Sequence, residues 1–278
     1  MWYTSIFPFK YFVYTRLLSW ATRISFLIFY VVPVILLFLS FSKTVDFNNI
    51  FCFFIAYIIV NYIYETGYIQ NDTQTVKLEK NATNRLEKFE EKFIDDSFFF
   101  IVIMRLAICL ALTLLLFYMK NDMFNFYFFF VLIVVEGIVF FIYNNVRSNL
   151  NFYLIFILSY IKSFSAVLPF IQDDILVVSV ALVFFQPLPK LIEFTREEKY
   201  KNVIIPRLCL SVDIFRVLYF SILTVSFCIL NWITESFIDL LCLSFYFLIS
   251  RSLAYILSKI SNRISNDINK NTKKSFRS

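Results

Sequence analysis

The sequence predicts an all-α protein, a polytopic transmembrane helical bundle of eight to nine spans around a central polar cavity that opens toward the cytoplasmic side. Of the 278 residues, 60% are hydrophobic and 21% are aromatic, and mean hydropathy is +0.73. The apolar runs are long enough to cross a hydrocarbon core of about 30 Å. At about 20 residues a span, the chain has no room for a sizeable soluble domain. We therefore expect a single integral membrane domain over residues 1–278.

The chain begins with aromatic residues interspersed with Lys10 and Arg16, and no short apolar region with a small-residue cleavage site follows. This pattern predicts an N-terminal interfacial helix over residues 1–22 rather than a signal sequence. The long apolar windows after it predict eight clear spans, near residues 24–43, 49–69, 97–118, 123–143, 150–168, 173–189, 211–231 and 237–257.

The charges fix the expected orientation. Nearly all the Lys and Arg residues between spans lie on one side, in the loops 70–96 and 190–210 and in the basic tail 259–278. The positive-inside rule makes that side cytoplasmic, together with both chain ends. The net charge of +6 is thus explained by topology, and no nucleic-acid partner is expected. The absence of His and of any CxxC spacing argues against soft-metal sites and histidine acid–base chemistry.

The polar end of the second span is the first candidate site. Asn61, Glu65, Tyr68 and Asp72 share one face of a helix, and acids at bilayer depth are costly and usually functional. Carboxylate and amide oxygens are ligands that Mg²⁺ prefers. Cations that can grip phosphate oxygens follow closely, namely Lys77, Lys80 and Arg85. The alternative interpretation is an interfacial helix end with solvated charges.

The second candidate cluster follows the sixth span. Glu193 and Glu197 lie four residues apart on one helical face, with Lys190 one turn earlier. Two prolines, Pro187 and Pro189, are expected to break the sixth helix and to free its backbone to line a cavity. A solvated helix face is the alternative interpretation here too.

Further polar residues fall inside the spans. Glu136 and Tyr143 share a face of the fourth span, and the two glycines of the chain, Gly67 and Gly137, each lie beside an intramembrane acid. Glycines in this position indicate close helix approach. Four basic residues are also expected inside spans. Arg105, Arg216 and Arg251 lie toward the inner side, where they can snorkel or pair with acids, whereas Lys162 lies deeper.

This layout resembles the UbiA-type prenyltransferase superfamily. The family motif N-x-x-x-D-x-x-x-D is similar to the Asn61-x-x-x-Glu65 run with Asp72 after it, and its K-x-x-R element is similar to the segment from Lys80 to Arg85. The second acidic motif, D-x-x-x-D, is matched with glutamates in place of aspartates. The tyrosine and basic residue after the fourth span look like Tyr143 and Arg147.

The resemblance implies a Mg²⁺-dependent transferase with a diphosphate leaving group. The variant run from residue 64 to 72 is similar to the branch that transfers 5-phosphoribosyl from phosphoribosyl pyrophosphate to polyprenyl phosphate, for surface-glycan synthesis at the bacterial inner membrane. The implied catalytic residues are Asn61, Glu65, Asp72 and Tyr143. The implied metal ligands are Glu65, Asp72, Glu193 and Glu197, and the implied substrate-binding residues are Tyr68, Lys77, Lys80, Arg85, Arg147, Lys190 and Arg196.

Three other functions remain open at this point. A prenyltransferase would move a prenyl group from its diphosphate to an aromatic or other lipid acceptor with the same site. A lipid or solute transporter would use the intramembrane charges as a pathway. A structural scaffold would need none of the acids.

Overall fold

A computed structural model describes residues 2–78, 84–146, 150–195 and 211–275, and the regular structure within these ranges is helical. The chain forms two compact units, Met1–Phe194 and Thr195–Ser278. The expectation of a single membrane domain stays a prediction.

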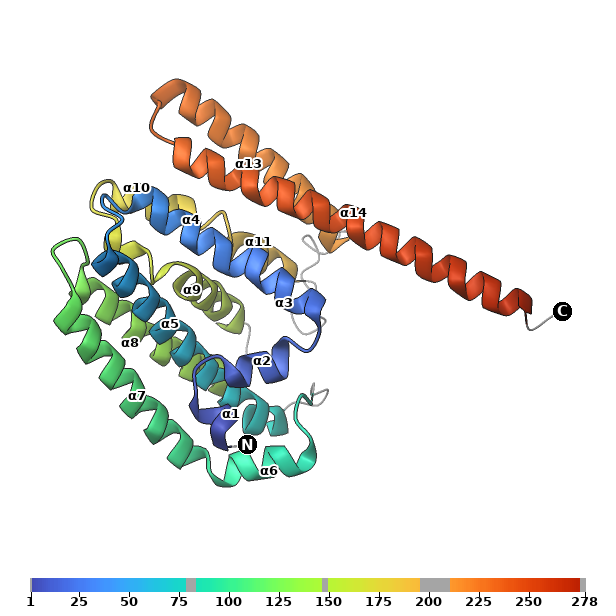
Figure 1. Ribbon diagram of the computed structural model, residues 1–278, viewed down its shortest axis with the longest axis horizontal. Coiled ribbons are helices and arrows are strands. Elements are labelled where there is room, and N and C mark those ends of the chain that lie inside the picture. The colour runs from blue at the N-terminus through green and yellow to red at the C-terminus, as the bar shows by residue number, and fades with distance from the viewer. Residues whose placement is uncertain (1, 79–83, 147–149, 196–210, 276–278) are drawn as a thin grey trace. The chain divides into compact units, whose positions relative to one another are not determined.

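The helices of the first unit (Figure 1) are α1 (Trp2–Ile6), α2 (Lys10–Arg16), α3 (Trp20–Phe26), the π-turn η1 (Leu27–Val31), α4 (Val32–Phe41), α5 (Phe47–Thr73), the 3₁₀ turn η2 (Thr75–Leu78), α6 (Lys88–Asp96), α7 (Phe98–Met119), α8 (Phe126–Asn145), α9 (Leu150–Phe164), the 3₁₀ turn η3 (Leu168–Phe170), α10 (Ile175–Leu182) and α11 (Pro187–Phe194).

The described residues contain seven helices that are long and apolar enough to cross a membrane, so the chain is a multi-pass membrane protein. These seven coincide with seven of the predicted windows: Trp20–Phe41, Phe47–Lys77, Phe98–Met119, Phe126–Asn145, Ile175–Phe194, Val212–Thr234 and Ile238–Ser261. The predicted window 150–168 is different, because its helix α9 has only 15 residues. A turn containing Pro169 follows it, and proline cannot continue a helical hydrogen-bond ladder.

Short polar side chains start several of these helices. The side chain of Ser19 accepts the backbone N–H of Thr22 at the start of α3, and Asp46 accepts that of Asn49 at the start of α5. Such caps satisfy backbone donors that have no partner within the helix. Ser19 and Asp46 therefore define the residues at which α3 and α5 begin.

A proline in the first span creates a contact with the sixth. Pro33 has no N–H, so the carbonyl of Phe29, four residues earlier, loses its helical donor. The backbone forms the π-turn η1 just before this position. The Phe29 carbonyl instead accepts the side-chain amide of Gln186 at 2.6 Å. Gln186 lies directly before α11, which begins at Pro187. The Gln186 side chain therefore contacts the first span at the predicted break of the sixth span.

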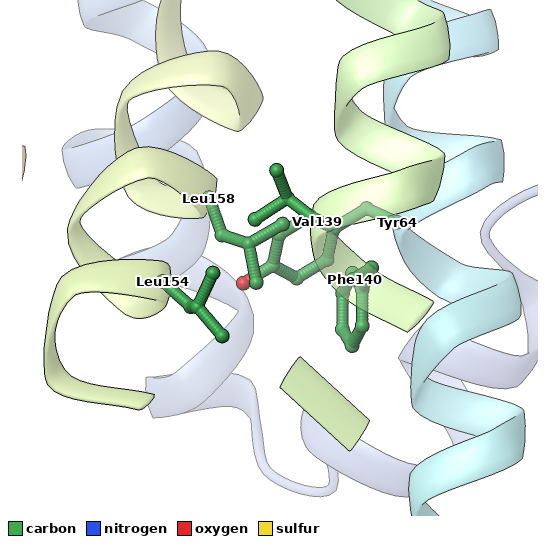
Figure 2. Close-up of a cluster of buried hydrophobic side chains, with 5 residues drawn as sticks. All are labelled: Tyr64, Val139, Phe140, Leu154 and Leu158. Carbon is green, nitrogen blue, oxygen red and sulfur yellow. The ribbon is translucent and has the colours of Figure 1, made fainter. Parts of the chain in front are cut away.

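The core of the first unit lies where α5, α8 and α9 meet. Tyr64, Val139, Phe140, Leu154 and Leu158 form a buried cluster there, with the Phe140 ring edge-on to the Tyr64 ring at 4.7 Å (Figure 2). A Cβ at Gly67 would lie 2.3 Å from the Phe140 ring. The absence of a side chain at this glycine therefore allows α5 and α8 to approach closely, whereas Gly137 has only an ordinary 3.9 Å neighbour.

The N-terminal segment forms two short helices, α1 and α2, where a single interfacial helix over 1–22 was predicted. Phe9 between them has a left-handed backbone, with φ of 62°. The Tyr62 hydroxyl of α5 donates to the carbonyl of Ile6, and Tyr11 is 0% exposed. The segment, named here the N-terminal hairpin (residues 2–16), is thus packed against α5, and its location at the membrane interface stays a prediction.

The second unit is a helical hairpin of α13 (Val212–Thr234) and α14 (Ile238–Ser275) (Figure 1). The rings of Phe220 and Phe247 stack between the two helices at 4.8 Å. Glu235, with φ of 56°, ends α13 at the connection. The helix α14 continues well past the predicted end of its span at residue 257, because its sequence turns polar without any Gly or Pro to stop it.

Candidate functional site

Glu65 is bound on both oxygens by protein donors. Its Oε1 accepts the backbone N–H of Phe12 at 2.7 Å, and its Oε2 accepts the N–H of Phe9 at 3.2 Å and Nη2 of Arg105 at 2.8 Å. Glu65 is 2% exposed and Arg105 is 1% exposed. This carboxylate therefore joins α5 to α7 and to the N-terminal hairpin.

Arg105 has a complete set of partners. Its guanidinium donates to Thr66 Oγ1, to the Ser5 carbonyl and to the Tyr62 carbonyl, each at 2.7 Å. It also lies over the Tyr62 ring, 3.8 Å from the centroid. A buried charge is tolerated when its donors are paired in this way, so Arg105 and Glu65 form a closed structural pair.

Asp72 is held by the other end of the N-terminal hairpin. Its carboxylate accepts the Tyr11 hydroxyl at 2.9 Å and two guanidinium nitrogens of Arg16, one of them, Nη2, at 2.9 Å. Arg85 reaches the same carboxylate at 3.3 Å. The hairpin is thus attached to α5 at two points, Glu65 and Asp72.

These contacts shift the pKa values of the hairpin residues. Burial, and then the charge of Asp72 and the hydrogen bond to it, raise the pKa of Tyr11 well above its ordinary value. Burial lowers the pKa of Arg16, but its hydrogen bonds to Asp72 and the carboxylate charge more than offset this, so the pKa is raised overall. Tyr11 is therefore a neutral donor and Arg16 a permanent cation.

The two acids do not fit Mg²⁺ in this arrangement. Magnesium needs close to six oxygen ligands at about 2.1 Å in octahedral geometry, whereas each carboxylate is occupied by guanidinium and other donors. Glu65 and Asp72 are also seven residues apart on α5, a rise of about 10 Å. No group of three His, Cys, Asp or Glu residues able to hold a metal occurs among the described residues.

A cavity of about 410 Å³ lies in the first unit between α2, α3, α5, α9 and α11. Its polar lining comes from two lysines, Lys162 and Lys190, from three tyrosines, and from four serine and threonine residues. Its apolar lining includes Phe12, Leu17, Phe26 and Ile155. Among the residues that the structure describes, two lysines and no carboxylate line its wall. The cavity therefore favours a ligand with an anionic end and an apolar end. It is named here the lysine cavity.

The Lys162 ammonium group lies close to three aromatic rings in this cavity. Its ammonium is 4.0 Å from the Tyr64 ring centroid, 5.2 Å from that of Phe12 and 5.3 Å from that of Tyr68, and it donates to the Tyr68 hydroxyl at a long 3.4 Å. The Arg16 guanidinium lies over the same Tyr68 ring, 4.2 Å from its centroid. Tyr68 thus stands between two cations, which are stabilised by its ring.

The other predicted site residues are scattered. Asn61 bonds its own helix, donating to the Tyr57 carbonyl at 2.9 Å, and Lys77 pairs with Asp95 on α6. Tyr143 packs beside the buried cluster of Figure 2, and Glu193 lies on α11 without lining the lysine cavity. Four predicted residues lie outside the described residues: Lys80, Arg147, Arg196 and Glu197.

Of the predicted site residues, the structure places Tyr68 and Lys190 in the lysine cavity and groups Asp72 with Arg85. The site prediction omitted Lys162 and Arg16. Lys162 carried a signal, since it is a lysine within an apolar window. Arg16 carried none, because its contact with Asp72 spans 56 residues. Glu136 is 0% exposed with no hydrogen-bond partner for either oxygen, and it does not line the cavity.

The fold and site define a multi-pass membrane protein whose first unit holds a cationic, aromatic-lined cavity. Comparisons with protein-family models, with curated proteins and with solved structures found no match.

Proposed function

We propose that this protein is a membrane-embedded transferase acting on a lipid phosphate, and specifically that it transfers 5-phosphoribosyl from phosphoribosyl pyrophosphate to polyprenyl phosphate. The observation that carries the proposal is the lysine cavity, whose two lysines match the phosphate and whose aromatic and aliphatic side chains match the isoprenoid chain. The resemblance of the polar segment 61–85 to UbiA-type enzymes supplies the reaction class.

In this proposal the lysines bind and orient the phosphate of the acceptor lipid. Lys162 is the principal donor, because its ammonium has three N–H groups and only one long hydrogen bond within the described residues. Lys190 contributes from α11. A phosphate oxygen held in this way is positioned to attack the anomeric carbon of the donor as pyrophosphate leaves, and the lysines hold the acceptor in line.

The proposed location is the bacterial cytoplasmic membrane, with both chain ends and the opening of the cavity on the cytoplasmic side. This topology needs an even number of crossings, so in the proposal the shorter apolar helix α9 crosses the bilayer in addition to the seven longer helices. The asymmetric distribution of Lys and Arg between loops supports this orientation. Phosphoribosyl pyrophosphate, a charged soluble donor, would then reach the site from the cytoplasm.

The test is a direct assay of the full chain. Purified protein in nanodiscs receives polyprenyl phosphate and phosphoribosyl pyrophosphate, in Mg²⁺ and in a parallel sample with EDTA, and mass spectrometry follows a lipid heavier by one phosphoribosyl group. We expect product from the parent protein, loss of product in Lys162→Met, and normal product in Lys43→Met. Lys43 is a matched control, because it is half-exposed and pairs with Asp173 at 2.8 Å.

Prenyl transfer is the second candidate, because a prenyl diphosphate has the same anionic head and apolar chain as the proposed acceptor. The same preparation is therefore also supplied with a prenyl diphosphate and an aromatic acceptor. Turnover of this pair alone would replace the phosphoribosyl proposal with the prenyl one, and no turnover of either pair would refute the transferase function.

A further inference from the structure

In the lysine cavity, the positive charge that would balance a bound anion comes from lysine side chains. Within the described ranges of the chain, the cavity wall has two lysines and no carboxylate. Lys162 has no carboxylate within the 4.0 Å of an ion pair among the described residues, and its ammonium contacts three aromatic rings and the Tyr68 hydroxyl. The buried carboxyl group of Glu136 interacts with Lys162 electrostatically but makes no hydrogen bond to it. Two of its three N–H donors are thus left for a ligand.

The carboxylates that would normally recruit a divalent cation have another task here. Glu65 binds Arg105 and two backbone N–H groups of the N-terminal hairpin, and Asp72 binds Arg16 and Tyr11. Neither residue lines the cavity. A metal ion at either carboxylate would have to displace a guanidinium that is itself largely buried, leaving that cation without its partner.

The arginine held by Asp72 also contacts the wall of the cavity. Arg16 is fixed by Asp72 and lies over the Tyr68 ring, on the residue whose hydroxyl accepts from Lys162. Arg16 adds no net charge to the cavity, because its guanidinium is paired with the Asp72 carboxylate. Lys162 and Lys190 are the cations of the described cavity wall, and they provide the charge that a divalent ion would otherwise bring to a phosphate.

We infer that the lysine cavity binds an isoprenoid phosphate without a divalent cation, with Lys162 and Lys190 as the direct phosphate ligands and Glu65 and Asp72 as positioning residues that hold the N-terminal hairpin. The identity of the lipid rests on the proposed function. The absence of a metal requirement is inferred from the contacts of Glu65 and Asp72 and from the two lysines in the cavity wall.

The experiment measures binding rather than turnover. The full chain is placed in nanodiscs of phosphatidylcholine, so that no anionic lipid competes, and farnesyl phosphate is titrated by calorimetry in excess EDTA and in excess Mg²⁺. We expect the same Kd in both within about twofold, and a Kd raised about tenfold or more in Lys162→Met, as for loss of a charge-assisted contact. Lys162→Arg should retain binding, and Lys43→Met should match the parent.

Farnesol and inorganic phosphate separate the two parts of the ligand, and each alone should bind more weakly than farnesyl phosphate. In a second measurement, Mn²⁺ is titrated and followed by electron paramagnetic resonance. We expect Glu65→Gln and Asp72→Asn to leave its binding curve unchanged. Size-exclusion profiles identify any variant that fails to fold.

The inference is overturned if EDTA weakens farnesyl phosphate binding tenfold and Mg²⁺ restores it, if the two acid variants abolish a Mn²⁺ site, or if folded Lys162→Met binds like the parent. The experiments test metal-independent binding and the proposed transferase function separately. Metal-independent binding without transferase product would retain the inference and refute the function, whereas product formation with metal-dependent binding would do the reverse.

Discussion

Alanine at Gly67 is expected to destabilise the first unit, while alanine at Gly137 is not. The new Cβ at Gly67 would lie 2.3 to 2.5 Å from three atoms of the Phe140 ring, about 1 Å inside the 3.4 Å at which ordinary contact begins. The ring has little room to yield, because it belongs to the buried cluster with Tyr64 (Figure 2). The backbone is also tied, since Asn144 of α8 donates to the Gly67 carbonyl at 2.9 Å.

The magnitude follows from two opposing terms. Overpacking a filled core costs about 1–3 kcal/mol, and replacing glycine by alanine within a helix returns at most about 1 kcal/mol. We therefore expect Gly67→Ala to lower the free energy of unfolding by about 1–2 kcal/mol. Gly137→Ala, whose Cβ would meet only an Ile63 atom at 3.9 Å, should leave it unchanged or raise it slightly.

The assay is equilibrium unfolding in mixed micelles with increasing denaturing detergent, followed by far-UV circular dichroism. A double-mutant cycle with Phe140→Leu isolates the overlap, because a smaller side chain should relieve it and give a coupling energy of at least about 0.5 kcal/mol. Equal stabilities for the Gly67→Ala and Gly137→Ala variants, or additive effects in the cycle, would refute the close approach of α5 and α8.

Three other perturbations test separate contacts by the same unfolding assay. Gln186→Leu removes the buried side-chain amide that donates to the Phe29 carbonyl and should cost about 1–3 kcal/mol. Arg105→Met removes the cation paired with the buried Glu65 carboxylate and should cost about 3–5 kcal/mol. A second change, Glu65→Gln, should recover part of this cost, because it removes the charge and keeps an acceptor for the N–H groups of Phe9 and Phe12. Because the pKa of Tyr11 is raised on folding, parent stability should fall as the pH rises above about 10, where the unfolded tyrosine ionises, and Tyr11→Phe should reduce this slope by up to about 1.4 kcal/mol per pH unit.

Exposed residues provide the controls for these variants. Gln172→Leu removes a glutamine at an exposed connection, and Lys43→Met removes a cation from an exposed pair. Each should change stability by less than about 0.5 kcal/mol. Gln186→Leu or Arg105→Met variants as stable as these controls would contradict the buried roles of both side chains.

The positions of the helices were largely predictable, because a run of about 20 apolar residues has few alternatives in a bilayer. The break before Pro187 was predictable for a similarly local reason. The shortness of α9 was not predicted, since the apolar composition of its window continues through residues 165–168 while the backbone turns. The division of the N-terminal hairpin at Phe9 was not predicted either, because it depends on contacts with α5.

The candidate site was less predictable than the helices. The shared face of Glu65 and Asp72 on α5 was readable from helical spacing, but their partners are 40 and 56 residues away in the sequence. Periodicity contains no information about such contacts. Lys162 was recognisable as a lysine at bilayer depth, yet its place in a cavity with Lys190 follows from how α9 and α11 pack.

The N-terminal hairpin also constrains the order in which the protein is assembled. Residues 2–16 leave the ribosome before the groups that hold them, Glu65, Asp72 and Arg105, are synthesised. Until α5 and α7 are both inserted, Arg16 and the backbone N–H groups of Phe9 and Phe12 have only water and lipid headgroups as partners. Docking of the hairpin is therefore a late step in biogenesis, and it closes one wall of the lysine cavity only after the spans around it are in place.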